Sequence, residues 1–260
     1  MLKFSPCIEL FWPELDFVGR IEKVAGAGFG AYEFWGWWDK DLDAVERATK
    51  DAGLAVAVCC VKTCFMADVP SILSAGGAAC FVEAVQDCFA VRDRLGCKRF
   101  IVTTGNELDG VARAAQRAAC VQALKTAAPM VEDAGITLVL EPLNVLVDHA
   151  GYFLSRSAEA FDIVEEVGSP AVKVLFDIYH QQITEGNLTP SICGNIGKIG
   201  HFHVANHPGR HEPMLGEINY EHVFKRIATL RYDGYIGLEF APSDPGRTEE
   251  ILGGVQALAR

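Results

Sequence analysis

Short apolar runs alternate along the chain with longer segments whose apolar residues recur every three or four positions. The short runs are rich in β-branched and aromatic residues, which favour the pleated surface of a strand. Eight of them predict strands, at residues 3–10, 31–34, 54–61, 99–103, 137–141, 172–177, 199–204 and 235–240. The segments between these runs have the three-to-four spacing that is typical of amphipathic helices.

Two of the helical segments show this spacing most clearly. Residues 42–52 place Leu42, Val45, Ala48 or Thr49, and Ala52 on one stripe. A second stripe comprises Val111, Ala114, Ala118, Val121, Leu124, Ala128 and Val131. Glycine follows four predicted helices, at Gly53, Gly96, Gly135 and Gly168, where a left-handed residue commonly ends a helix.

A strand followed by a helix, repeated eight times at about 30 residues per unit, predicts a parallel sheet closed into a barrel. We therefore expect an α/β fold, a single (β/α)8 TIM barrel that spans residues 1–260 as one domain. A doubly wound open sheet is the alternative. It is disfavoured because such sheets usually have fewer strands, and because no GxGxxG motif follows the first strand.

Composition and charge exclude several classes of function. Half of the residues are hydrophobic and 22% are charged, as in ordinary globular proteins. The formal net charge of −11 argues against a nucleic-acid partner, because phosphate binding needs a basic surface. No apolar run reaches the roughly 18 residues of a membrane span. Pro6, Glu9, Pro13 and Glu14 interrupt the N-terminal segment, which therefore does not resemble a secretory signal.

Cysteine usage suggests a reducing compartment. The nine cysteines are scattered, only Cys59 and Cys60 are adjacent, and no CxxC pair occurs. Most of them lie in apolar surroundings, where a reduced cysteine behaves as a small hydrophobic residue. We therefore expect a cytoplasmic protein without a disulfide framework.

Polar residues end four consecutive predicted strands. In a barrel of this type the active site lies at the C-terminal ends of the strands. Glu141, Asp177 and Glu239 end three of these strands, and the HFHV segment directs His201 and His203 to one face of the fourth. Taken singly, each carboxylate could cap a helix and His201 could be structural.

Taken together, these side chains predict a metal site, because three carboxylates at one barrel mouth repel one another unless a cation lies among them. Three carboxylates and one imidazole suit one divalent ion, Mn²⁺ or Mg²⁺, with Co²⁺ as a further candidate. A structural zinc site would need cysteines or more histidines.

Five motifs occur in an order and spacing that resemble a known family. LEPLN, FDIYH, HFHVANHPGRHEP, GEINY and GLEF are similar to those of the xylose-isomerase-like barrels, which include hydroxypyruvate isomerases, ketose 3-epimerases and, more distantly, endonuclease IV. The resemblance spans nearly the whole chain and is strongest over residues 140–242. PGRHEP followed by GEINY most resembles the hydroxypyruvate isomerases. HFH instead resembles ketose epimerases of the D-tagatose 3-epimerase type.

The resemblance implies roles for particular residues. It implies four metal ligands, Glu141, Asp177, His203 and Glu239, of which Glu141 and Glu239 would also be the acid/base pair. His180 and Arg210 would contact substrate oxygens. The ketose epimerases carry a further substrate-binding glutamate six residues after the first ligand, where this chain has Val147. That departure favours a substrate that is shorter than a six-carbon ketose, or of a different shape.

The predicted function is a divalent-metal-dependent isomerase that transfers a proton through a metal-stabilised enediolate. Hydroxypyruvate, converted to tartronate semialdehyde, or a close short-chain analogue is the expected substrate. The alternatives are a ketose 3-epimerase acting on D-tagatose, D-allulose or L-ribulose, and a non-catalytic sugar-binding barrel. A DNA-repair phosphodiesterase is disfavoured because it would need a multi-zinc cluster and a basic groove. The resemblance also implies a homo-oligomer, a dimer or tetramer.

Two assignments stay open at the level of sequence. Arg210 suits a substrate carboxylate because its guanidinium can form two parallel hydrogen bonds, but it could instead pair with Glu212 or Glu217 in its own loop. A tryptophan-rich segment follows the second strand and could line the site or a subunit interface; it contains Trp35, Trp37 and Trp38.

Overall fold

The strands form a parallel, curved sheet in a computed structural model that describes residues 2–258. Seven strands are hydrogen-bonded in the order β1 (Lys3–Pro6), β9 (Tyr235–Leu238), β8 (Ile199–Val204), β7 (Val172–Asp177), β6 (Thr137–Leu140), β5 (Arg99–Val102) and β4 (Cys59–Cys60). A separate parallel pair joins β2 (Ala31–Tyr32) to β3 (Ala55–Val56). Neighbours in space are mostly neighbours in sequence, as in a barrel built from successive strand–helix units.

The ring closes between β1 and β2. Cys7 and Glu33 form a single parallel bridge there, and the Ile8 amide donates to the Glu33 carbonyl at 2.9 Å. The strand expected at 54–61 is two short pieces, because β3 pairs with β2 whereas β4 pairs with β5. The (β/α)8 TIM barrel is therefore confirmed, and the open sheet is wrong.

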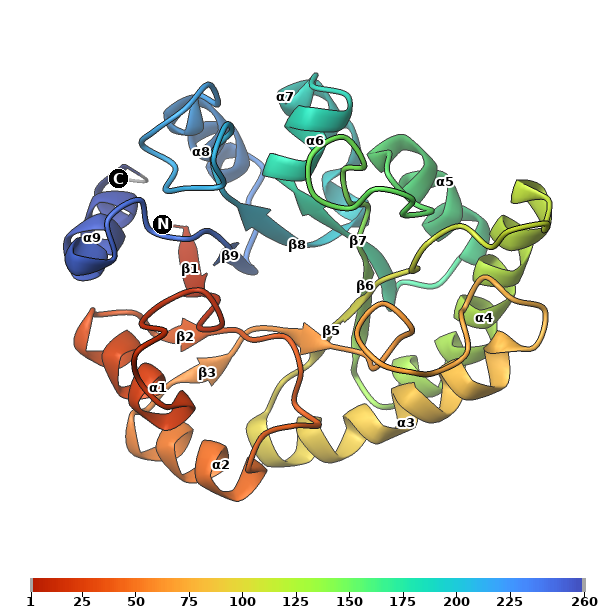
Figure 1. Cartoon of the computed structure of the whole chain (residues 1–260), viewed down its shortest axis with the longest axis horizontal. Coiled ribbons are helices and arrows are strands. Elements are labelled where there is room, and N and C mark those ends of the chain that lie inside the picture. The colour runs from red at the N-terminus through yellow and green to blue at the C-terminus, as the bar shows by residue number, and fades with distance from the viewer. Residues whose placement is uncertain (1, 259–260) are drawn as a thin grey trace.

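Helices surround the strands on the outside, as Figure 1 shows. In order they are α1 (Phe17–Gly26), α2 (Leu42–Asp51), α3 (Gly77–Leu95), α4 (Arg113–Asp133), α5 (Ser157–Val167), α6 (Ile178–Thr184), α7 (Leu188–Asn195), α8 (Tyr220–Thr229) and α9 (Thr248–Leu258). Two short 3-10 helices, η1 (Ile196–Lys198) and η2 (Pro245–Arg247), precede β8 and α9. Within residues 2–258 none of the helices combines the length and the apolar character that crossing a membrane requires.

The two predicted helical stripes differ in outcome. In α2, Val45, Ala48 and Thr49 are buried as expected. In α4 the stripe is wrong over its first three residues, since Val111 precedes the helix and Val111, Ala114 and Ala118 are all exposed. The buried face of α4 begins instead at Gln116. The side-chain amide of this residue accepts from the Leu108 amide and donates to the Leu108 carbonyl, which satisfies both backbone groups in the loop before the helix. The glycines predicted to follow helices, Gly53, Gly96, Gly135 and Gly168, all have positive φ angles.

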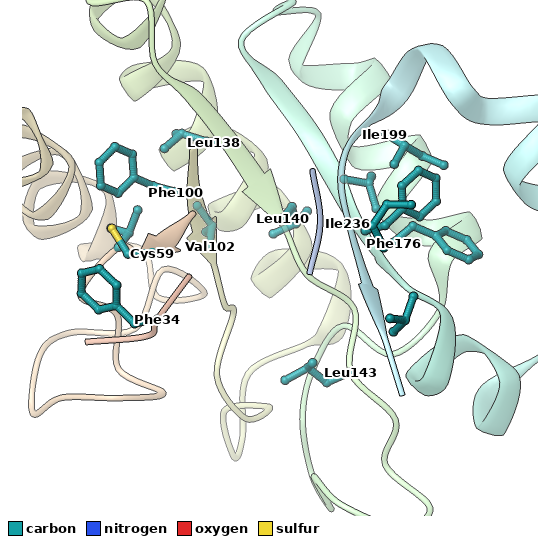
Figure 2. Close-up of a cluster of buried hydrophobic side chains, with 14 of the residues drawn as sticks. Phe34, Cys59, Phe100, Val102, Leu138, Leu140, Leu143, Phe176, Ile199 and Ile236 are labelled. Carbon is teal, nitrogen blue, oxygen red and sulfur yellow. The ribbon is translucent and has the colours of Figure 1, made fainter. Parts of the chain in front are cut away.

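Alternating strand residues divide the core into two parts. One set points outward and packs against the helices; Figure 2 shows part of it, including Phe100, Val102, Leu138, Leu140 and Phe176. The other set fills the barrel interior and comprises Val58, Cys60, Ile101, Val139 and Leu175. Because His201 pairs in register with Leu175 and His203 with Asp177, both histidines share the interior face. Polar side chains therefore replace apolar ones toward the C-terminal end of the interior.

Candidate metal centre and active site

Four of the predicted site residues meet at this end of the barrel. Asp177 ends β7 and His203 lies in β8, while Glu141 and Glu239 follow β6 and β9 directly. The His203 Nδ1 atom lies 3.4 Å from Glu141 Oε1, 3.5 Å from Glu239 Oε2 and 4.0 Å from Asp177 Oδ2. All four side chains are buried, and one donor atom from each lies within 4.8 Å of the others.

These residues fit a divalent ion. The His203 Nδ1 atom has no hydrogen-bond partner among residues 2–258, although it is buried and faces three carboxylates. Buried polar atoms are rarely left unpaired, and carboxylates this close repel one another without a cation. Three oxygen donors and one imidazole nitrogen match the preference of Mn²⁺ or Mg²⁺. The donor set does not distinguish between these ions.

The ionisation of the three carboxylates reflects their crowding. Burial, and then the charge of Glu239, raise the pKa of Asp177 to about 7. Burial also raises the pKa of Glu141. Burial alone would raise the pKa of Glu239 too, but His203 and Arg210 outweigh it and hold that pKa well below the usual value. Glu239 is therefore the carboxylate that its neighbours stabilise most strongly as an anion.

His180, the first predicted substrate contact, has a defined tautomer. The Asn144 backbone amide donates to His180 Nδ1 at 3.3 Å, so this nitrogen carries no hydrogen. Burial, followed by the charge of Arg210, keeps the pKa of His180 well below the usual histidine value. The ring is consequently neutral with its hydrogen on Nε2, an atom that is buried without a hydrogen-bond partner in the described chain. His180 thus presents a free donor to the site.

Arg210, the second predicted substrate contact, projects into the same site. Its Nη2 atom pairs with Glu239, and its guanidinium carbon lies 5.3 Å from the centre of the Tyr179 ring. A pairing with Glu212 or Glu217 is wrong, because Glu212 accepts from Ser243 and Glu217 accepts from Gln182. The Arg210 Nε atom has no partner within residues 2–258 and remains available as a donor.

The tryptophan-rich segment contributes one wall of the site. Trp35 Nε1 donates to Glu239 Oε1 at 2.8 Å, so both carboxylate oxygens of Glu239 accept from a neighbouring side chain. Trp37 Nε1 instead donates to the Cys60 carbonyl at 3.0 Å, which fixes the loop after β2. Trp38 packs against the interior apolar set. Trp35 therefore lines the site, and the other two support it.

A cavity of about 260 Å³ opens above the carboxylates. Its polar lining comprises Thr103, Glu141, His149, His180, Arg210 and Glu239, and its apolar lining Trp35, Cys60, Phe65, Met66, Ile101 and Leu143. This volume is below the roughly 300–1,000 Å³ of sites for drug-sized ligands, so a small molecule fits best. Val147 is 60% exposed and does not line the cavity.

Sequence reasoning missed several lining residues. The His149 ring centre lies 5.3 Å from that of His180 and 5.4 Å from that of Phe65, yet His149 comes from a loop without periodicity. Phe65 and Met66 follow β4 in a similar loop. No spacing rule identifies such residues, since loops place them through contacts with distant segments.

Glu33 was also missed, and it lies just below the metal ligands. Its carboxylate accepts from Ser5 Oγ at 2.7 Å and contacts His201 Nε2 and His203 Nε2, each at 3.0 Å. Burial alone would raise the pKa of Glu33, but His203 and His201 outweigh it and lower that pKa. His201 therefore belongs to the Glu33 group and lies outside the carboxylate cluster.

Comparisons with known proteins agree with this fold. Residues 21–259 match the family model described as xylose isomerase-like TIM barrel. The chain is similar to a hydroxypyruvate isomerase of Escherichia coli K12, with 32% identity over 93% of this chain and 94% of the relative. It is also similar to a 2-oxo-tetronate isomerase of Cupriavidus necator, with 35% identity over 93% of this chain and 94% of that one.

A solved structure extends the likeness to three dimensions. It is described as an AP endonuclease, family 2, from Brucella melitensis, and it matches with a TM-score of 0.92, 30% identity and 99% coverage of both chains. A D-psicose 3-epimerase shares the fold at a TM-score of 0.80 and 21% identity, over 100% of this chain and 98% of that one. The chain therefore belongs to the xylose isomerase-like TIM-barrel family of enzymes.

Proposed function

We propose that this protein is a divalent-metal-dependent isomerase of short hydroxy-keto acids, converting hydroxypyruvate to tartronate semialdehyde or acting on a close short-chain analogue. The observation that carries the proposal is the pairing of two buried glutamates with two unpartnered donors around one small cavity. The glutamates are Glu141 and Glu239, and the donors are His180 Nε2 and Arg210 Nε. The two isomerases at 32% and 35% identity support this choice of reaction class.

Glu141, Asp177, His203 and Glu239 would hold the metal ion. When bound, a divalent ion supplies Lewis-acid stabilisation of the negative charge that develops on substrate oxygens. The chain's own residues carry the proton. Glu239 takes it from the carbon that carries the hydroxyl, Glu141 gives a proton to the former carbonyl carbon, and the hydroxyl hydrogen passes to the former carbonyl oxygen. Exchange with solvent then returns both glutamates to their starting protonation states, and their roles exchange in the reverse direction.

The environments of the two glutamates support these roles. Trp35 and Arg210 each donate to one oxygen of Glu239, which keeps the carboxylate ionised and in place before it accepts a proton. The Glu141 carboxylate has a close contact only with His203 among the ionisable partners recorded for residues 2–258. Glu141 is therefore the member of the pair that more readily carries a proton between turnovers.

Arg210 and His180 would select and orient the substrate. A guanidinium matches the planar geometry of a carboxylate, so Arg210 Nε suits the acid end of a keto acid. The Nε2 hydrogen of His180 suits a carbonyl or hydroxyl oxygen. Trp35, Phe65 and Met66 belong to the apolar lining of the cavity, which would shield the reacting carbons from water.

A ketose 3-epimerase is the second candidate, because the HFH motif with His203 resembles that group. The cavity does not favour it. Val147 occupies the position at which those enzymes carry a further glutamate, and its side chain lies outside the cavity. A ketose would lose the hydrogen bonds that such a glutamate provides.

Proton NMR in D₂O tests the proposal directly. Metal-stripped protein is incubated with hydroxypyruvate, 2-oxo-tetronate or a panel of ketoses, with and without added Mn²⁺ or Mg²⁺. We expect deuterium incorporation and a new carbonyl isomer from a keto acid only when metal is present. Inversion of a ketose would favour the epimerase, and no exchange into any substrate despite metal binding would favour a non-catalytic barrel.

Substitutions test the residue roles. Glu239→Gln and Glu141→Gln should abolish turnover, and Glu165→Gln on the exposed side of α5 is the matched control. Bound Mn²⁺ is measured in each variant, so that loss of metal and loss of the base are separated. Substantial turnover by Glu239→Gln would refute its assignment as the base.

A further inference from the structure

Beneath the metal ligands lies a buried group, the Glu33 cluster, that consists of Glu33, Ser5, His201 and the inner edge of His203. We propose that Glu33 is a positioning residue. It holds the His203 imidazole with Nε2 toward Glu33 and Nδ1 toward the metal centre, and it thereby increases the affinity of the centre for the metal ion. This inference rests on the metal centre of the proposed function. It assigns a role to a carboxylate that is not itself part of the four-ligand group.

The first support is the geometry of the contact. Glu33 Oε1 lies 3.0 Å from His203 Nε2, and both side chains are 1% exposed. The two atoms are within ion-pair distance but are not aligned as a hydrogen bond, and neither has another partner in the described chain. An ionised carboxylate can only accept, so at this distance it favours a hydrogen on Nε2. The opposite nitrogen, Nδ1, then has a lone pair directed at the three carboxylates. Metal-binding histidines commonly use one nitrogen for the ion and the other for a carboxylate, which fixes the ring.

The second support is that Glu33 is itself held in place. Ser5 Oγ donates to Oε2 at 2.7 Å, and His201 Nε2 lies 3.0 Å from the same oxygen. These groups come from β1 and β8, while Glu33 directly follows β2. Three parts of the barrel therefore converge on one carboxylate, which leaves it little freedom to turn away from His203.

The third support is the glycine opposite His203. Gly237 in β9 is paired in register with His203. A Cβ atom at position 237 would lie 2.2 Å from Glu33 Oε1 and 2.5 Å from His203 Cδ2, both far below the distance of an ordinary contact. The absence of a side chain at this position is what allows the carboxylate and the imidazole to meet.

A competing interpretation is a second metal ion bound by Glu33, His201 and His203, whose donor atoms are also close enough. The two imidazoles, however, approach different oxygens of Glu33 through their Nε2 atoms, His201 in a hydrogen bond to Oε2 and His203 in an ion-pair contact with Oε1, each at 3.0 Å. An ion at this place would have to displace both contacts. The stoichiometry of metal binding distinguishes the two interpretations.

Isothermal titration of Mn²⁺ into the metal-stripped protein tests the inference without substrate. We expect one ion per chain in the wild type and in Glu33→Gln, with affinity about 10- to 100-fold weaker in the variant. Glu165→Gln should match the wild type. Urea unfolding of the metal-free proteins is measured alongside, because a purely structural role would lower stability and leave the Mn²⁺ affinity of the folded protein unchanged.

Each outcome bears on the inference. Glu33→Gln binding Mn²⁺ within about twofold of the wild type would overturn it, as would two ions in the wild type and one in the variant. If Glu33→Gln does not fold, Glu33→Asp decides, since it keeps the charge and draws the carboxylate back from His203 Nε2. Unchanged affinity in Glu33→Asp would then overturn the inference. If the wild type binds no Mn²⁺, the proposed metal centre is wrong. If the wild type binds Mn²⁺ and Glu33→Gln binds it equally well, only the role of Glu33 is wrong.

Discussion

Substituting Gly237 by alanine should both destabilise the protein and disturb its metal centre. The added methyl group would lie 2.2 Å from Glu33 Oε1, and Glu33 cannot simply move aside because Ser5 and His201 hold it. If Glu33 moves, it gives up hydrogen bonds that contribute about 1.5–3 kcal/mol each to a charged acceptor. If the strands move instead, overpacking costs about 1–3 kcal/mol.

The less costly of these routes determines the result. Alanine also loses less backbone entropy than glycine, which offsets about 0.5–1 kcal/mol. We therefore expect the free energy of unfolding of metal-free Gly237→Ala to fall by about 1–2 kcal/mol. Urea unfolding followed by circular dichroism measures this difference, and the same samples give Mn²⁺ affinity by titration.

Gly253 offers a matched control. It lies within α9, and a Cβ atom there would meet nothing within 4 Å. Gly253→Ala should raise the free energy of unfolding by about 0.5–1 kcal/mol, because alanine favours a helix. The reasoning would be refuted if Gly237→Ala had the same free energy of unfolding as the wild type while Gly253→Ala showed the expected increase. The Glu33 cluster would then be neither rigid nor tightly packed.

Three further predictions follow from the site and the core. Arg210→Lys should raise the KM for a keto-acid substrate by about 10- to 100-fold, because lysine lacks the planar set of donors of arginine. Arg247→Lys on the surface should leave the KM unchanged. Equal KM values for Arg210→Lys and the wild type in steady-state assays would contradict this role. Mn²⁺ at a hundredfold its Kd should stabilise the protein by about 2.7 kcal/mol in thermal or urea unfolding, an increment that EDTA removes, and no increment would argue against the metal centre. Ellman's reagent should react quickly with at most the three half-buried thiols, Cys64, Cys80 and Cys193, because burial protects the other six; rapid labelling of a fourth thiol would contradict the packing.

The features that depend on local pattern could be predicted from the sequence. The bounds of β7 and β8 coincide with the runs expected at 172–177 and 199–204. The first run is mostly apolar and ends at Asp177, and the second alternates apolar residues with histidines, a period of two that predicts a strand. The same rule identified Glu141 and Glu239, which follow directly on β6 and β9. Parallel strands bring their carboxyl ends to one rim, so residues far apart in sequence could be placed together.

The features that depend on contacts between distant residues could not be predicted from the sequence. The division of residues 54–61 into β3 and β4 arises because β2 pairs with the first part of this segment and β5 pairs with the second. Glu33 lies beside a strand of two residues, too short to show which side chains point inward. Its neighbour Phe34 is also buried, so alternation alone does not separate a core residue from a site residue. Only the contacts with Ser5 and His203 identify it.

The place where the barrel closes has a consequence for the stability of the metal-free protein. Between β1 and β2 a single bridge at Cys7 and Glu33 completes the ring, so this seam has fewer ladder hydrogen bonds than the continuous sheet from β1 to β4. Any breathing motion that parts the seam also carries Glu33 away from His203, because the bridge and the carboxylate belong to the same residue. If Glu33 positions His203 for the metal as proposed, loading with metal would also favour the closed ring, and slow amide exchange around Glu33 would report on both.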